Sequence, residues 1–153
     1  MPIYTDSYYL VDNRSKSFIF RFIDEYIPNA IETSDEYPVP WFAESPVNIF
    51  FNIDDILKYL ENNLHSEYAI YWRNPKEDLD IKHFMIFFTD DGKMIFGVSI
   101  NGEEPNTAVS INVFKELSGF LNTKTGCITV EEPPPTNSIE FIEFCSNRFI
   151  PTL

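Results

Sequence analysis

Residues 82–100 read KHFMIFFTDDGKMIFGVSI, two apolar runs separated by a short polar turn. The Asp91-Gly92 pair favours the positive φ angles that a tight hairpin turn requires. In the second run, the apolar residues at 94, 96, 98 and 100 share one face of a strand, because side chains alternate with a period of two. The first run is apolar on both faces, which is typical of a central strand covered on both sides. This stretch therefore predicts an antiparallel hairpin at the centre of a sheet.

Shorter β-favouring segments lie on both sides of this hairpin. Residues 68–72 (YAIYW) predict a strand before it, and residues 127–131 predict a strand after it that ends at the prolines 133–135. Residues 7–11 (SYYLV) indicate an extra, short N-terminal strand. Residues 28–46 contain four prolines and an acidic cluster, which favours a long loop or meander.

Apolar residues at three- and four-residue spacing predict helices. The clearest has Leu57 and Leu60 on its apolar stripe and Asn52 as a suitable N-cap. The first helix ends at Pro28, although its phenylalanines at alternate positions leave a strand as the alternative. The helices are expected at residues 17–27, 53–64 and 113–121, and from the N-cap Asn137 onward.

The order of these elements defines the expected fold class. Consecutive strands joined by short links favour an antiparallel meander, because neighbours in sequence tend to pair in space. We therefore expect an α+β protein with one domain over residues 1–153, built as a meander of three to five strands flanked by about four helices. A chain of this length buries roughly 70% of its unfolded surface, so neither a disulfide nor a metal is needed to stabilise the fold.

The chain carries 24 acidic and 11 basic side chains, a formal net charge of −13. This charge repels nucleic acid phosphates and anionic lipids, so we expect no nucleic acid or membrane partner and a cationic protein partner instead. The first residues lack the basic and apolar regions of a secretory signal, and no apolar run reaches the ~20 residues of a membrane span. Since Cys127 and Cys145 are expected as reduced core residues, we expect a cytoplasmic protein.

Residues suited to catalysis or metal binding are few. His65 and His83 stand alone, and with the two cysteines they lack the short spacing by which one turn presents two ligands to zinc. The five glycines form no phosphate-binding loop, and adjacent carboxylates are so frequent that no pair stands out. We therefore expect a protein that is not an enzyme, with no catalytic residue, metal or cofactor. A small hydrolase that uses scattered carboxylates is a less favoured alternative.

Negative charge is concentrated in residues 24–67, which contain ten acidic side chains and one basic side chain, Lys58. Aromatic residues lie among these acids, and aromatic anchors surrounded by carboxylates suit a site that binds a basic protein. The alternative is that Trp41 and Phe42 fix the loop to the core while the acids only keep the protein soluble. The candidate partner-binding residues are Glu32, Asp35, Glu36, Tyr37, Trp41, Glu44, Asp54 and Asp55.

The overall pattern resembles bacterial immunity proteins of polymorphic toxin and contact-dependent growth inhibition systems. The resemblance is carried by the small acidic layout, the Phe-rich helix ended by Pro28, and the segments YAIYW (68–72), FFTDDG (87–92), IFG (95–97) and EEPP (131–134). It implies a cytosolic protein that binds one cognate toxin domain, often a basic nuclease, and blocks its active site or substrate groove. It implies no catalytic residues.

Charge and resemblance together predict a monomeric immunity protein that neutralises a basic, nuclease-type toxin through its acidic surface. A nuclease groove must be cationic to hold phosphates, so a surface with a similar pattern of negative charge can occupy it. The alternative is an acidic, dimeric secretion or assembly chaperone for an effector protein. In that case the apolar segment 139–150 would form the dimer or client surface.

Overall fold

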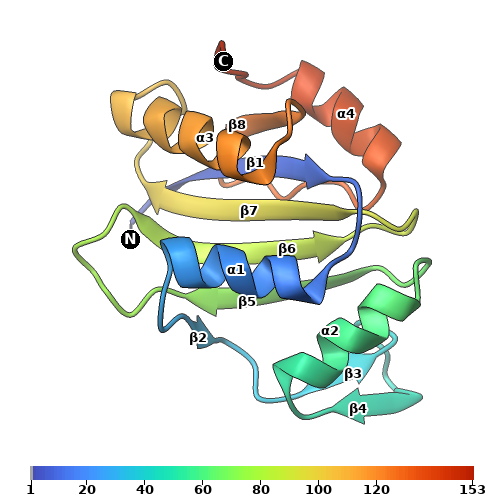
Figure 1. Cartoon of the computed structure of the whole chain (residues 1–153). Helices are drawn as coiled ribbons and strands as arrows, with labels where there is room; N and C mark the ends of the chain where they lie inside the picture. The colour runs from blue at the N-terminus through green and yellow to red at the C-terminus, as the bar shows by residue number, and fades with distance from the viewer. Residues whose placement is uncertain (1) are drawn as a thin grey trace.

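The computed structural model describes residues 2–153, which fold into four helices and eight strands (Figure 1). In chain order the elements are β1 (Tyr4–Val11), α1 (Lys16–Tyr26), β2 (Ile31–Glu32), β3 (Tyr37–Val39), β4 (Asn48–Phe50), α2 (Ile53–Asn62), β5 (Tyr68–Arg73), β6 (Ile81–Phe88), β7 (Met94–Asn101), α3 (Ala108–Leu121), β8 (Gly126–Val130) and α4 (Ser138–Ser146). Within these residues, no helix is both long enough and apolar enough to cross a membrane.

Six strands form one antiparallel sheet in the order β2-β5-β6-β7-β1-β8. The predicted central hairpin is confirmed, because β6 pairs with β7 with Phe88 opposite Met94. Gly92 in the connecting turn has a φ of 88°. Strand β1 pairs with β7 on one side and β8 on the other, with Tyr8 opposite Gly97. The N-terminal strand therefore lies inside the sheet.

Helices α1 and α3 cover one face of the sheet (Figure 1), and the larger core lies beneath them. Phe22 of α1 stacks on Phe84 of β6 at 4.6 Å between ring centroids and packs edge-on against Phe96 of β7 at 5.3 Å. On the opposite face, α4 contributes Phe141 to a smaller core that also contains the buried thiols Cys127 and Cys145. The two cysteines are unbridged, in agreement with the sequence prediction.

The α+β class and the four helices are confirmed, but the predicted number of strands is wrong. The main sheet has six strands and a second sheet has two, whereas three to five were expected. Residues 28–46, expected as a loop or meander, contain β2 and β3, which are too short to produce a periodic pattern. Strand β1 begins at Tyr4 rather than at position 7, because polar Asp6 and Ser7 obscure its alternation.

Two other expectations need correction. Strand β6 is not fully covered on both faces, because His83 and Met85 are only half-buried on the side opposite α1. Helix α3 begins at Ala108, five residues before the expected start. Its true N-cap is Thr107, whose hydroxyl accepts the backbone N–H of Ser110 at 3.2 Å.

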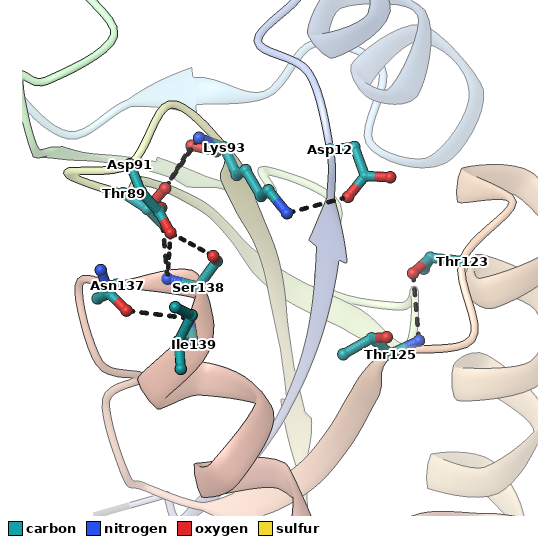
Figure 2. A network of polar contacts seen from close by, with 9 residues as sticks. All are labelled: Asp12, Thr89, Asp91, Lys93, Thr123, Thr125, Asn137, Ser138 and Ile139. Carbon is teal, nitrogen blue, oxygen red and sulfur yellow. Dashed lines mark hydrogen bonds and ion pairs between the residues drawn. The ribbon is translucent and has the colours of Figure 1, made fainter.

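The turn of the central hairpin is tied to the start of α4 (Figure 2). Asp91 accepts hydrogen bonds from both the backbone N–H of Ser138, at 3.2 Å, and the Ser138 hydroxyl. Asn137 caps the helix, because its side chain accepts the N–H of Ile139 at 3.0 Å, as the sequence predicted. These contacts fix α4 over one end of the second sheet face.

Residues 33–62 form a small lobe, called the acidic lobe below, which contains β3, β4 and α2 and lies beside β5 (Figure 1). Arg14, which precedes α1, attaches the end of α2 to the sheet. Its guanidinium donates to the carbonyls of Leu60 at 2.7 Å, Asn63 at 2.8 Å and Ser66 at 2.8 Å, and also to the Thr89 carbonyl. Burial lowers the pKa of Arg14 to about 10, so the group remains charged at neutral pH.

Candidate functional site

The hairpin of β3 and β4 exposes large apolar side chains. Phe42 and Val47, in the loop between the strands, are 82% and 88% exposed, and Phe51, directly after β4, is 71% exposed. The loop that presents them is ordered by hydrogen bonds, because the Val47 N–H donates to the Val39 carbonyl at 2.8 Å. Large apolar side chains exposed along one hairpin make it a candidate protein-binding surface.

Trp41 and Phe42 have different environments, although they are adjacent in sequence. Their rings stack with centroids 4.4 Å apart. The Trp41 ring is partly buried and packs against both cores, with its centroid 6.1 Å from that of Tyr68. Trp41 therefore fixes the loop to the body of the protein, while Phe42 extends into solvent on top of it.

Three of the predicted acids lie free on this lobe. Asp35 and Glu36 precede β3, and Glu44 lies in the β3–β4 loop beside Phe42. All three are exposed, and in residues 2–153 no hydrogen bond or ion pair engages their carboxylates. Their full charge is therefore available to an approaching partner.

Two other predicted residues bind each other. The hydroxyl of Tyr37 donates a hydrogen bond to the exposed Glu32 carboxylate, and burial together with that carboxylate raises the pKa of Tyr37. Tyr37 is only 3% exposed, so it stabilises the lobe from within and offers a partner no contact area.

Asp54 and Asp55 lie in the first turn of α2 and have structural partners there. Asp54 pairs with Lys16 of α1 at 3.1 Å. Asp55 accepts a hydrogen bond from the side chain of the N-cap Asn52 at 2.9 Å. Both carboxylates are exposed, but these contacts and the helix N-terminus already compensate part of their charge.

A second candidate site lies on the sheet face opposite α1 and α3. Helix α4 and Trp41 cover only the half of this face where Leu10, Ala69 and Ile95 lie. The other half contains a cavity of about 510 Å³ between the strands and the loop that follows β8. Residues that line it include Tyr4, Asp6, Tyr8, Tyr71, His83 and Ser99.

This site was not predicted from the sequence. Asp6 lies before the segment expected to be a strand, so the face of the sheet on which its side chain lies could not be assigned. The register of the predicted hairpin does place His83 opposite Ser99, and two facing polar residues among apolar ones were an available signal. Part of this sheet face stays uncovered because α4 is short, and the residues around the cavity give no indication of the length of α4.

Asp6 carries the least compensated charge in this cavity. It is 9% exposed, and burial, followed by the charge of Glu131, raises its pKa to about 7. A hydrogen bond with the Glu131 backbone opposes this shift. Glu132 also lines the cavity, but Arg148 pairs with it at 2.7 Å.

His83 forms a neutral polar pair with Ser99, whose hydroxyl oxygen lies 2.8 Å from Nδ1. The Tyr4 ring packs edge-on against the imidazole, with centroids 4.9 Å apart. Burial and then the charge of Arg73 lower the pKa of His83. Among residues 2–153 no carboxylate pairs with His83 in the way that orients a catalytic histidine. Nor does that part of the chain group three or more His, Cys, Asp or Glu side chains around a metal position.

Comparison with known proteins identifies no relative: no protein-family model, curated protein or solved structure matches this chain. Function is therefore inferred below from the fold, the exposed side chains and the charges of the chain itself.

Proposed function

We propose that this protein is a non-enzymatic immunity protein that binds and neutralises a cognate basic toxin domain, of nuclease type, through its acidic lobe. The observation that carries the proposal is the exposure of Phe42, Val47 and Phe51 in the most acidic part of the chain. Water contact with such side chains is unfavourable, and a partner that covers them gains the corresponding hydrophobic free energy.

The free carboxylates of the same lobe support a basic partner. Asp35, Glu36 and Glu44 create a negative field that attracts and orients a positively charged domain, which raises the association rate. A nuclease groove is such a surface, since it must hold phosphates. Occupation of that groove by the acidic lobe would exclude the nucleic acid substrate.

The lobe is also held in place before any partner arrives. Arg14 ties the end of α2 to the sheet through four carbonyl groups, and Trp41 anchors the β3–β4 loop. A preformed surface loses less conformational entropy on binding than a flexible one. Fast and tight capture of a toxin, which an immunity protein requires, is consistent with this arrangement.

The proposal expects a toxin gene beside the gene of this protein, and the test uses the domain that this toxin gene encodes, in an inactivated form. The double variant Asp35→Lys with Glu36→Lys should slow association at least tenfold at low salt and weaken its dependence on ionic strength. Phe42→Ala should instead raise the dissociation rate, because it removes apolar contact and leaves the charge unchanged. Stopped-flow fluorescence measures both rates.

A matched control separates the acidic lobe from general charge. Glu103→Lys with Glu104→Lys makes the same change in net charge at two exposed acids outside the lobe. We expect this control to alter association by less than threefold. Equal slowing by the two double variants, or no slowing by either, would contradict a binding surface at the lobe.

A dimeric secretion or assembly chaperone is the second candidate, and one observation favours it. Ile139 and Ile142, one turn apart on α4, are 74% and 51% exposed, which is unusual for a helix of a monomer. If this face is a dimer interface, light scattering will give twice the mass of 17.9 kDa. Ile139→Glu will then restore the monomer. A monomer for the unmodified protein would favour the immunity function.

A further inference from the structure

The cavity on the open half of the sheet face has no role in the proposed toxin binding and is argued independently of it. Its volume of about 510 Å³ lies within the usual range of small-molecule sites. It lies over β1, β5, β6 and β7, on the part of the sheet that α4 leaves uncovered. Sites on rigid strands hold their side chains in fixed positions, which favours specific binding.

The walls of the cavity are aromatic. Tyr4, Tyr8, Tyr71 and Phe87 all line it. The rings support one another: Phe87 meets the rings of Tyr8 at 6.0 Å and Tyr71 at 5.9 Å, each nearly perpendicular. The Tyr8 hydroxyl donates to the Glu132 carbonyl at 2.7 Å, which fixes that ring. Aromatic faces attract cations through their quadrupole and repel anions.

Two carboxylates that form no ion pair in the described residues line the cavity: Asp6, which is buried, and Glu131, which is exposed and accepts the Tyr4 N–H at 3.1 Å. Asp6 is nine-tenths buried, and no basic side chain within residues 2–153 forms an ion pair with it or with Glu131. Arg148 already compensates the third acid, Glu132. A buried carboxylate beside a second one costs free energy when ionised, and a bound cation would remove that cost.

We propose that this cavity binds a small organic cation, an alkylguanidinium or alkylammonium group, with Asp6 and Glu131 holding the charge and Tyr4, Tyr8 and Tyr71 enclosing it. An alkyl chain behind the charged group would contact Met85 and Phe87, which also line the cavity. The neutral His83 and Ser99 pair adds polar contacts without adding charge.

Two other groups near the cavity, Glu132 and Arg73, also affect the binding of a cation. Glu132 is paired with Arg148, while Arg73 lies close enough to His83 to lower its pKa. Arg73 is itself exposed, and it is not among the causes of the pKa shift of Asp6. Water therefore screens the repulsion between Arg73 and a bound cation, whereas the attraction between the buried Asp6 and the cation is screened much less.

The test compares n-butylguanidinium with n-butylurea, which has nearly the same shape but no charge. We expect the cation to shift backbone amide NMR signals of β1, β6 and β7 and to bind at least tenfold more tightly than the urea. At pH 7, binding should also release a proton from Asp6. The heat measured by calorimetry should therefore differ between buffers of different ionisation enthalpy, and the affinity should increase from pH 6 to pH 8.

Variants test the residues involved. Asp6→Asn should reduce the affinity at least tenfold and abolish proton release, whereas Asp35→Asn, the same change on the acidic lobe, should do neither. If Asp6→Asn fails to fold, Tyr71→Leu at the half-exposed wall replaces it and should weaken binding about fivefold.

The proposal would be overturned by equal binding of the two compounds or by NMR shifts located away from the cavity. It would also fail if the cation did not bind at 10 mM, roughly the weakest affinity expected for so small a ligand. Binding of an arginine-containing peptide without binding of free butylguanidinium would also overturn it, because the occupant would then be a protein. None of these results bears on the acidic lobe, so failure here is distinct from failure of the proposed immunity function.

Discussion

Arg14 donates a 2.7 Å hydrogen bond to the carbonyl of Leu60, 46 residues further along the chain. The contact joins the turn between β1 and α1 to the last turn of α2, and thereby the sheet to the acidic lobe. The guanidinium lies over the Phe88 ring at 5.2 Å and is 7% exposed. The C-terminal carbonyls of a helix favour a positive charge, so Arg14 also compensates the dipole of α2.

Replacement of Arg14 should loosen the lobe. We expect Arg14→Lys to lower the free energy of unfolding by about 2–4 kcal/mol, because one ammonium group cannot bridge four separated carbonyls. Urea denaturation measures the loss, and hydrogen exchange should show faster opening of α2 than of β7. Uniform acceleration across both elements would mean that Arg14 stabilises the whole fold rather than the lobe.

Phe42 and Trp41 should respond differently to truncation. Phe42→Ala should change the free energy of unfolding by less than about 0.5 kcal/mol, because its ring is largely in water. Trp41→Ala should cost about 2 kcal/mol, because its ring contacts both cores. Chemical denaturation of the two variants provides the comparison. A costly Phe42→Ala would indicate that this ring is structural.

The stability of the protein should depend on the ionisation of Asp6. Its pKa is about 7 when folded, against an ordinary value of 3.8, so the folded state binds more protons between these values. The free energy of unfolding therefore falls, through this group, as the pH rises from about 4 to 7. Asp6→Asn lacks this group, so its stability minus that of the unmodified protein should rise by about 3–4 kcal/mol between pH 4 and pH 8, at roughly 1.4 kcal/mol for each unit of the pKa shift.

The same measurement on Asp35→Asn provides the control for that pH dependence. This exposed carboxylate lies on the acidic lobe and does not line the cavity, so a change in the pH profile as large as that of Asp6→Asn would show that the effect is not specific to Asp6. Parallel profiles for Asp6→Asn and the unmodified protein would show that Asp6 is ionised as freely when folded as when unfolded.

Two glycines should give opposite results when changed to alanine. A Cβ at Gly126 would lie 2.4 Å from the Tyr8 carbonyl oxygen, so Gly126→Ala must displace backbone and should cost about 3 kcal/mol. At Gly119, within α3, a Cβ meets nothing within 4 Å. Gly119→Ala should therefore stabilise the protein by about 0.5–1 kcal/mol through helix propensity. Thermal unfolding would show the two midpoints moving in opposite directions.

The two thiols should be unreactive in the folded protein. Cys127 of β8 and Cys145 of α4 are both buried, and their mutual hydrogen bond and then burial raise the pKa of Cys127. Since only the thiolate reacts, modification by a disulfide reagent at pH 8 should be limited by unfolding. Rapid modification without denaturant would show that α4 opens independently of the sheet.

Local signals were sufficient to predict the central hairpin and the start of two helices. The turn at Gly92 and the alternation of residues 94–100 are determined by neighbouring residues, as are the N-caps Asn52 and Asn137. These elements appear in the structure close to their predicted positions, because local preference and tertiary packing agree there.

Long-range features could not be predicted in the same way. Asp6 becomes part of a cavity only because β1 inserts between β7 and β8, a pairing with residues 83 or more positions away. The sequence also does not indicate which of Trp41 and Phe42 anchors the loop. The different burial of the two rings depends on the turn at residues 40–43. In this turn Phe42 has a φ of 60°, and the Ala43 N–H donates to the Pro40 carbonyl at 3.2 Å.

The central claim is that the acidic lobe neutralises a basic toxin domain, and cell survival tests it most directly. The neighbouring toxin domain is expressed with the unmodified protein, with the triple lobe variant Asp35→Lys, Glu36→Lys and Phe42→Ala, or with the control Glu103→Lys and Glu104→Lys. We expect the unmodified protein and the control to restore colony formation, and the lobe variant to lose at least a hundredfold in survivors. Equal protection by the lobe variant, or no protection by any form, would contradict the claim.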